Sequence, residues 1–255
     1  MKKKREPKSP PAGITIEGPE SGALTIQPDL PDTLFVLPMR RAVPFPNLMM
    51  PILLDSPRSR DIISQAEAQN GYVLMLTQKD DELDEPGPQD FHQVGVIARV
   101  LKTLKLPDGN ATAMTQGLQR ARVVKFLRRK KPFLVARTEV LVEIPASGKR
   151  GKALFRKLQE ALHKVLEVTD GYPEEAATAV LNIEQPDQLA DFTGSYFLKE
   201  TVDRQRLLEA ADVNKRLEIA LKFVMSELEL AELGNRIQNE IREKAETTQH
   251  LSRAR

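Results

Sequence analysis

The segment from Ser147 to Ala153 has residue types that could bind phosphate, with two Gly-Lys pairs just ahead of a predicted helix. A phosphate-binding loop needs another glycine five residues earlier and a serine or threonine directly after the lysine. The chain has glutamate or alanine at the earlier position, and neither lysine is followed by serine or threonine. A flexible basic linker therefore fits this segment better than a nucleotide site.

An acidic run between Asp80 and Glu85 raises the question of calcium binding. A calcium loop that starts at Asp80 would need glycine at position 85 and glutamate at position 91. The chain has Glu85 and Phe91 at these positions. The prolines that follow the run favour a solvated loop instead of a cation site.

The histidines and serines do not form a recognisable catalytic group. His92, His163 and His250 lie in three different stretches, and none has a serine and an acid within helical reach. The chain contains no cysteine, which excludes disulfides, thiolate zinc ligands and cysteine nucleophiles. We therefore predict no catalytic, cofactor-binding or metal-binding residue, and no enzymatic activity of this chain alone.

The composition is typical of a soluble globular protein. The 255 residues include 40% hydrophobic and 29% charged side chains. No apolar run is long enough for a membrane span and no secretory signal is recognisable, so we expect no membrane partner and a cytoplasmic location. The formal charge of +2 lacks the basic excess of strong phosphate binders, so nucleic acid is not the first partner expected.

The patterns along the chain predict an α+β protein with a strand-rich part before a helical part. Residues 1–30 are rich in lysine, proline and glycine and are expected to form a disordered tail. Short apolar runs then favour an antiparallel barrel or sandwich, with one short helix from Pro57 to Gln69. A tight hairpin turn is expected at Asp108-Gly109. The expected strands are 34–37, 71–77, 93–104, 111–118, 121–127 and 133–144.

After Pro145 the apolar spacing changes from about two residues to about 3.6, which predicts helices. One helix is expected to stop at Gly171-Tyr172-Pro173, and others to cover 174–181, 186–196, 201–210 and 213–248. The last helix contains an a/d seam that is a candidate for assembly, made of Leu217, Leu221, Val224 and Leu228. Gly234 interrupts the apolar stripe, so this helix is expected to pack along its first half and project along its second.

Two surfaces are candidates for binding a macromolecule. The segment from Pro38 to Leu54 is apolar, but its prolines keep it out of a central strand. Its candidate protein-binding residues are Phe45, Leu48, Met49 and Met50, and a plug at one end of the barrel is an equally good interpretation. The second candidate is the basic stretch from Arg120 to Lys131. It has few aromatic neighbours, which favours a charged outer face with a turn at 128–132.

Several motifs resemble those of a known family. The segment Leu37-Pro-Met-Arg-Arg-Ala-Val-Pro-Phe-Pro-Asn-Leu-Met-Met-Pro51 is similar to the opening signature of the Lon amino-terminal domain. The similarity continues at Val94-Gly-Val-Ile-Ala-Arg-Val100 and Leu104-Lys-Leu-Pro-Asp-Gly109, and in the helical region at Gln185-Pro-Asp-Gln-Leu-Ala-Asp191. It covers about Leu34 to Gln249 in order, and the combination is highly specific.

The resemblance implies a PUA-like β-barrel over 31–145, a helical bundle over 146–210 and a long helix over 211–255. In the full protease this helix leads to an ATPase module and a serine-lysine peptidase module, which would hold ATP and magnesium. No motif of either module occurs in this chain. The implied partners are unfolded or tagged protein substrates and further copies of the chain, which form a hexamer in the full-length family.

The expected function is therefore substrate recognition and oligomer assembly for an ATP-dependent protease that degrades misfolded and regulatory proteins. Two alternatives stay open. A stand-alone PUA-like module could bind nucleic acid through the face from Arg120 to Lys131, and a stand-alone scaffold could dimerise through the seam from Leu217 to Ala231.

Overall fold

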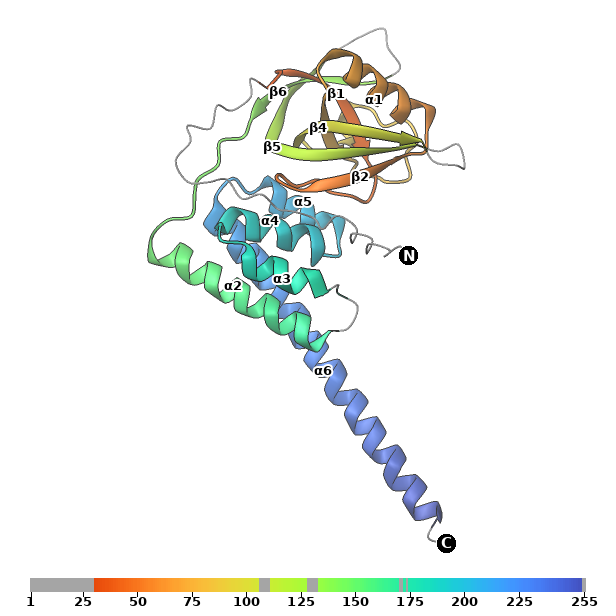
Figure 1. The fold of residues 1–255 in the computed structure, drawn as a ribbon, viewed down its shortest axis with the longest axis vertical. Coiled ribbons are helices and arrows are strands. Elements are labelled where there is room, and N and C mark those ends of the chain that lie inside the picture. Colours follow the sequence, from red (N-terminus) through yellow and green to blue (C-terminus); the bar gives the residue numbers. More distant parts are fainter. Residues whose placement is uncertain (1–29, 106–110, 128–132, 170–171, 173, 254–255) are drawn as a thin grey trace, which may run out of the picture. The chain divides into compact units, whose positions relative to one another are not determined.

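The computed structural model describes residues 30–105, 111–127, 133–169, 172 and 174–253. The predicted tail over 1–30, the hairpin turn at Asp108-Gly109 and the turn at 128–132 lie outside the described residues, apart from position 30. The described chain has a strand-rich part followed by a helical part (Figure 1). None of the described helices is both long enough and apolar enough to cross a membrane.

The strand-rich part is a six-stranded sheet with the order β2-β5-β4-β3-β1-β6. The strand β6 pairs with both β1 and β5, so five of the strands connect in a closed circuit while β2 pairs only with β5. The strands are β1 (Thr33–Met39), β2 (Met49–Leu54), β3 (Tyr72–Thr77), β4 (Val94–Lys105), β5 (Ala111–Leu127) and β6 (Val135–Val140).

One strand pair corrects the expectation of a purely antiparallel sheet. β1 runs parallel to β3, with Phe35 opposite Val73 and Met39 opposite Thr77. Two parallel neighbours need a connection that crosses back over the sheet, and this connection includes β2 and helix α1 (Pro57–Gln69). The helix spans the predicted residues because Pro57 occupies its first turn and the Ser56 side chain accepts a hydrogen bond from the Ser59 amide.

The segment from Pro38 to Leu54, expected to lie outside a central strand, contains an edge strand. β2 includes Pro51 and lies at the edge of the sheet, where a residue without an amide hydrogen is tolerated. Prolines therefore kept this segment out of a central position, as expected, but did not prevent it from pairing with β5. The residues before it form a loop held to Gly117 by two backbone bonds of 2.9 Å, from the Asn47 amide and to the Leu48 carbonyl.

The helical part comprises five helices of the described chain. They are α2 (Gly148–Val168), α3 (Glu174–Asn182), α4 (Pro186–Tyr196), α5 (Thr201–Glu209) and α6 (Val213–Arg253). The helix α6 packs along α2 and α4 (Figure 1). The Ser147–Ala153 segment is not a flexible linker, because Ser147 is the N-cap residue of α2 and the residues from Gly148 onward belong to the helix.

Two apolar cores hold these parts. One fills the space between the sheet and α1, with Leu37, Ile62 and Met75 among its buried residues. The other lies among the helices and extends to the sheet through Phe45 and Val96. The second core is therefore shared between the two parts, and the residues from Pro31 onward form one compact unit.

The substitution Gly117→Ala should lower the free energy of unfolding by about 2 kcal/mol. A Cβ atom at this position would lie 2.2 Å from the backbone oxygen of Phe45, which cannot move without shifting the loop. The matched control is Gly234→Ala in α6, where a Cβ would meet nothing within 4 Å and helix propensity should add up to about 1 kcal/mol. Urea denaturation measures both, and equal effects would contradict the close approach.

Candidate functional site

Four charged side chains meet where the sheet and the helices join, and we call them the ionic junction. Arg120 lies on β5, Asp191 on α4 and Arg216 on α6, while Glu143 follows β6. Arg120 Nη1 lies 2.8 Å from Glu143 Oε1 and 3.0 Å from Asp191 Oδ2, and Arg120 Nη2 also donates to Asp191. Arg216 Nη1 lies 3.3 Å from Asp191 Oδ1, and Arg216 Nη2 donates to Glu143. Each carboxylate therefore bridges both guanidinium groups.

Three of the four residues of the ionic junction are almost completely buried, and Glu143 is half-buried. Arg120 has 1% of its surface exposed, Arg216 has none and Asp191 has 2%. An isolated charge in such a place costs several kcal/mol, so the two arginines and the two carboxylates are stable there only as a group. Arg120 Nε also donates to the Leu208 carbonyl at 3.0 Å, which ties β5 to α5 as well. This network fixes the helices against the sheet.

The pKa values of the two carboxyl groups in the ionic junction are shifted in opposite directions. Burial alone would raise the pKa of Glu143, but Arg216 and Arg120 outweigh burial and hold that pKa below its ordinary value of 4.5. Burial raises the pKa of Asp191, which lies deeper, although both arginines oppose the rise. Glu143 is half-buried and paired with both guanidinium groups, so it carries its full negative charge at neutral pH.

The predicted protein-binding residues divide into buried and exposed members. Phe45 is 1% exposed and belongs to the core among the helices. Its ring lies so close to Gly194 of α4 that a Cβ there would be 2.6 Å from the Phe45 Cζ atom. The prediction that Phe45 forms part of a binding surface is therefore wrong, and Phe45 instead packs the loop against the helices. Leu48 and Met50 are half-buried.

The exposed apolar residues of this region lie on β2. Met49 is 57% exposed and Leu53 is 55% exposed, with the exposed Pro51 between them. Side chains two apart in a strand point to the same face, so these three form one apolar row. Because β2 pairs only with β5, its other backbone edge has no strand partner among the described residues. We call this row and its open backbone edge the β2 edge.

The predicted a/d seam of α6 is buried inside the protein. Leu217, Val224 and Leu228 are buried in the core among the helices, and Leu221 packs partly against it. Their neighbours come mainly from α2 and α4, the helices in closest contact with α6. The burial of this seam contradicts its predicted role in assembly. The a/d spacing reflects packing of α6 against other helices of the same chain.

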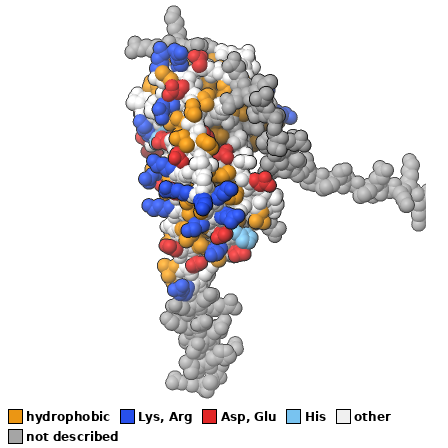
Figure 2. Space-filling model, turned by 90° about the vertical axis from the view of Figure 1, so that its left-hand side faces the viewer, with side chains coloured by type: hydrophobic (Ala, Val, Ile, Leu, Met, Phe, Trp, Pro, Cys, Tyr) orange, Lys and Arg blue, Asp and Glu red, His pale blue; other side chains and the backbone are white. Residues whose placement is uncertain are grey.

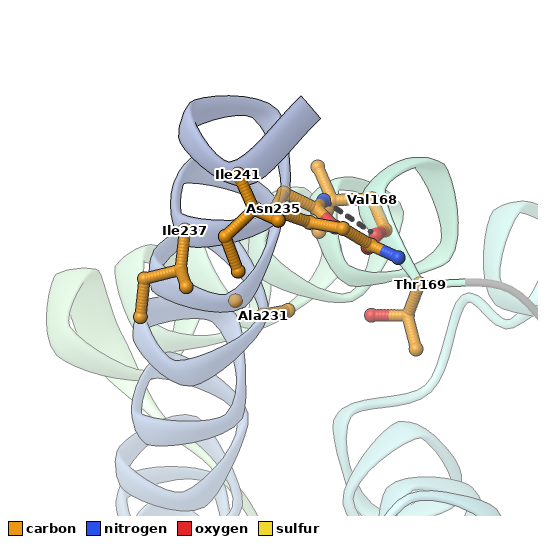
Figure 3. Close-up of a pocket in the computed structure, with 8 residues that line it drawn as sticks. Val168, Thr169, Ala231, Asn235, Ile237 and Ile241 are labelled. Carbon is orange, nitrogen blue, oxygen red and sulfur yellow. Dashed lines mark hydrogen bonds between the residues drawn. The ribbon is translucent and has the colours of Figure 1, made fainter. Parts of the chain in front are cut away.

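A different apolar face of α6 is exposed. Leu230, Leu233, Ile237 and Ile241 are each at least about half exposed, and they repeat at steps of three and four residues. Ile237 and Ile241 lie beside the end of α2, where they line a groove of about 440 Å³ with Val168, Thr169 and Ala231 (Figure 3). Asn235 donates to the Val168 carbonyl at 3.1 Å and holds this part of α6 to α2.

The basic side chains are placed differently from the prediction. Arg120, at one end of the predicted basic face, points into the ionic junction, while Arg122 and Lys125 are exposed and residues 128–131 lie outside the described chain. Figure 2 shows lysine and arginine side chains gathered over α2 instead. The exposed basic residues of α2 are Lys149, Arg150, Lys152, Arg156, Lys157 and Lys164.

The remaining residues considered for chemistry form local contacts. His92 Nδ1 lies 3.5 Å from Glu209 Oε1, and His163 Nε2 lies 3.4 Å from Glu167 Oε1 one helical turn away. The hydrogen bond from His92 lowers the pKa of Glu209. Asp81 and Asp84 of the acidic run form ion pairs with Arg41 and Arg40. Within the described residues, no group of histidine, aspartate and glutamate side chains is arranged to hold a metal ion.

The same arrangement of sheet and helices falls within a known protein family. A family model described as the ATP-dependent protease La (LON) substrate-binding domain matches residues 33–226. This range includes the β2 edge, the ionic junction and α6 as far as Ser226. The chain belongs to this family. The resemblance to the Lon amino-terminal domain read from the sequence is thus confirmed.

Curated Lon proteases are identical to this chain at about a third of the aligned residues. Lon protease of Heliobacterium modesticaldum is 33% identical over 214 residues, and Lon protease 2 of Thermus thermophilus is 34% identical over 220 residues. The alignments cover 84% and 86% of this chain but only 26% and 27% of those proteins. The chain therefore spans about a quarter of the length of these Lon relatives.

Solved structures of Lon amino-terminal domains share the fold. The N-terminal domain of Mycobacterium avium complex Lon protease has a TM-score of 0.64 and 23% identity, and covers 76% of this chain and 98% of its own. The Lon N-terminal domain protein from Xanthomonas campestris has a TM-score of 0.54 and 16% identity, and covers 74% of this chain and 97% of its own. At these identities the likeness concerns the fold alone.

Removing one guanidinium group from the ionic junction should be costly. Arg216→Met leaves two carboxylates with one arginine in a buried site, so we expect the free energy of unfolding to fall by about 3–5 kcal/mol. Arg150→Met is the control, since its ion pair with Glu218 is exposed on the Arg150 side and should cost less than about 1 kcal/mol. Urea denaturation compares the two variants. A loss below about 1 kcal/mol for Arg216→Met would contradict the structural role of the junction.

Proposed function

We propose that this chain recognises protein substrates for a Lon protease by binding exposed apolar segments of unfolded chains. Membership in a family described as a substrate-binding domain supports this proposal. The observation that carries it is the β2 edge, where Met49, Pro51 and Leu53 present an apolar row beside an open strand edge. An unfolded segment offers the two features that this edge can bind, namely apolar side chains and unpaired backbone groups.

The backbone pairing of β2 determines which of its groups face the open edge. In an antiparallel pair, residues alternate between bonding to the partner strand and pointing away from it. The Leu48 carbonyl bonds to Gly117, and the Met50 carbonyl accepts from the Thr115 side chain at 2.8 Å, so the even-numbered residues face β5. Met49 and Leu53 therefore direct their backbone groups outward.

Pro51 limits how firmly another strand can pair with β2. It occupies the central outward position and has no amide hydrogen, which removes one donor from the open edge. Proline at an edge is a common protection against permanent pairing with other chains. Contacts made by a few apolar side chains and two outward residues leave little free energy after the segment is ordered, so binding should be weak and reversible.

The wider role in this proposal concerns the whole protease. A substrate held by this region would be passed to the ATPase and peptidase modules, which would hold ATP and magnesium and degrade misfolded and regulatory proteins in the cytoplasm. The strand-rich part would be the PUA-like barrel that the resemblance implies. The alternative of nucleic-acid binding has less support, because Arg120 of its predicted face is buried in the ionic junction.

The substitutions Met49→Ser and Leu53→Ser, made together, should reduce capture of an unfolded protein several-fold, because they remove most of the apolar row. The measurement is crosslinking of the purified chain to reduced, unfolded lysozyme, with native lysozyme as the folded form. We expect selective capture of the unfolded form by the wild-type chain and near-background capture by the double variant.

The control for this experiment is Leu181→Ser on α3, which removes a side chain of similar exposure, 61%, from the helical part. This variant should capture unfolded lysozyme as well as the wild type does. Equal capture by all three proteins, or equal capture of folded and unfolded lysozyme by the wild type, would contradict recognition at the β2 edge.

We propose in addition that assembly uses the exposed face of α6 and not the buried seam. Leu230, Leu233, Ile237 and Ile241 form an exposed apolar face, and Ile237 and Ile241 lie beyond Asn235, which bonds to the last residue of α2. A repeated apolar face of this kind on a long helix is suited to pairing with the same face of another copy. The groove beside Ile237 and Ile241 would receive apolar side chains from that copy (Figure 3).

The double substitution Ile237→Asp and Ile241→Asp should shift the chain toward the monomer in sedimentation velocity experiments, because charges would replace the apolar contact. The control is Val202→Asp on α5, which is 74% exposed and lies away from this face. A self-association constant that is unchanged in the Ile237/Ile241 variant, or equally reduced in both variants, would contradict assembly through α6.

A further inference from the structure

A second cleft lies in the helical part, away from the groove of Figure 3, with a volume of about 210 Å³. This volume is below the roughly 300–1,000 Å³ of sites that hold a drug-sized molecule, and it suits one long side chain. The end of α2, Tyr172 after it, the C-terminal cap of α4, the beginning of α5 and the first half of α6 contribute to it. The main lining residues are Tyr172, Phe197, Phe223, Glu200, Asp203 and Glu227.

The floor of the cleft is aromatic and aliphatic. The rings of Tyr172 and Phe197 stack with their centroids 4.9 Å apart. Phe197 is buried beneath, while Tyr172 and Phe223 are half-buried and so reach the cleft. Burial raises the pKa of Tyr172, which keeps its hydroxyl neutral at physiological pH. The floor can therefore contact a hydrocarbon chain and offers aromatic faces to a cation.

The rim of the cleft carries an excess of negative charge. Its acidic residues are Glu200, Asp203 and Glu227, and its one basic residue is Lys199. Lys199 Nζ lies 2.6 Å from Glu227 Oε2, so these two charges largely cancel. The Asp203 side chain has no hydrogen bond or ion pair to another described residue, although the residue is half-buried. Glu200 is exposed, and Arg204 lies four residues further along and attracts it, so its charge is partly compensated. The unpaired carboxylate of Asp203, with Glu200 beside it, leaves the rim with net negative charge over an apolar floor.

We propose that this cleft binds a lysine or arginine side chain of a protein substrate. The aliphatic stem of such a side chain would lie on the floor, and its charged end would reach the carboxylates of Glu200 and Asp203. The aromatic faces add a favourable cation contact. An apolar side chain would fill the same volume but leave the carboxylates without a partner, and an acidic one would be repelled.

This inference rests on the proposed function. It adds a basic side chain to the apolar segments as a substrate feature that the chain would recognise. The β2 edge would bind the apolar part of an unfolded segment, and the cleft would favour segments that also carry a basic residue. The two sites use different residues, so they can be tested separately.

The test compares two fluorescein-labelled, unstructured peptides that share an apolar sequence and differ at one position, arginine in one and citrulline in the other. Citrulline keeps the shape of arginine but has no charge. Fluorescence anisotropy with the full chain should show about five-fold tighter binding of the arginine peptide, the size expected for an exposed ion pair with a cation–aromatic contact.

The variants Asp203→Asn and Glu200→Gln should each reduce this preference, and the two together should abolish it. Asp187→Asn is the matched control, because Asp187 occupies the first turn of α4 as Asp203 occupies the first turn of α5 but lies outside the cleft. It should keep the full preference. Thermal unfolding of each variant checks that the fold is retained.

The outcomes distinguish failure of the proposed cleft from failure of the proposed function. Equal binding of the arginine and citrulline peptides by the wild type would contradict binding of a basic side chain in the cleft. A preference for arginine that survives in the double variant, or is lost in Asp187→Asn, would contradict it as well. Binding of neither peptide by the wild type would overturn the proposed function and this inference together.

Discussion

The mutual neutralisation of four charges, three of them buried and one half-buried, is the constraint on which this structure depends. Arg120, Glu143, Asp191 and Arg216 come from the sheet, the segment after it and two helices, and none of them could be buried alone at a tolerable cost. Each is stable only when the other three are in position. The sheet and the helical part are consequently parts of one unit, although their local patterns are those of two domains.

This constraint also explains why the candidate binding surface has its particular form. The loop before β2 lies between Gly117 of the sheet and Gly194 of α4, and Phe45 fills the space between them. The loop is thereby anchored from both sides, and β2 follows it as an edge strand with Met49 and Leu53 outward. A rigid anchor behind an exposed apolar row suits recognition of many different unfolded segments, because the surface does not have to be ordered at each binding event.

Local patterns predicted the elements well and their partners poorly. The helix from Pro57 to Gln69 was predicted correctly because proline and serine mark its start within the sequence itself. The parallel pairing of β1 with β3 was missed, because strand runs close together in sequence carry no sign of a crossover. Arg120 was expected on an outer face, because its acidic partners Glu143 and Asp191 lie 23 and 71 positions further along the chain and no local pattern connects them. The same limit applies to Phe45 and to the seam at Leu217, where apolar residues predict burial or binding equally well.

Hydrogen exchange of the native chain, comparing the wild type with Arg216→Met, tests most directly whether the ionic junction unites the sheet and the helices. If it does, the slowest amides of β5 and of the first half of α6 exchange with the same free energy of opening in the wild type. The substitution then lowers both values by the same amount, although Arg216 belongs to α6 alone. A loss confined to α6, with β5 still protected as in the wild type, would contradict a junction that joins the two parts.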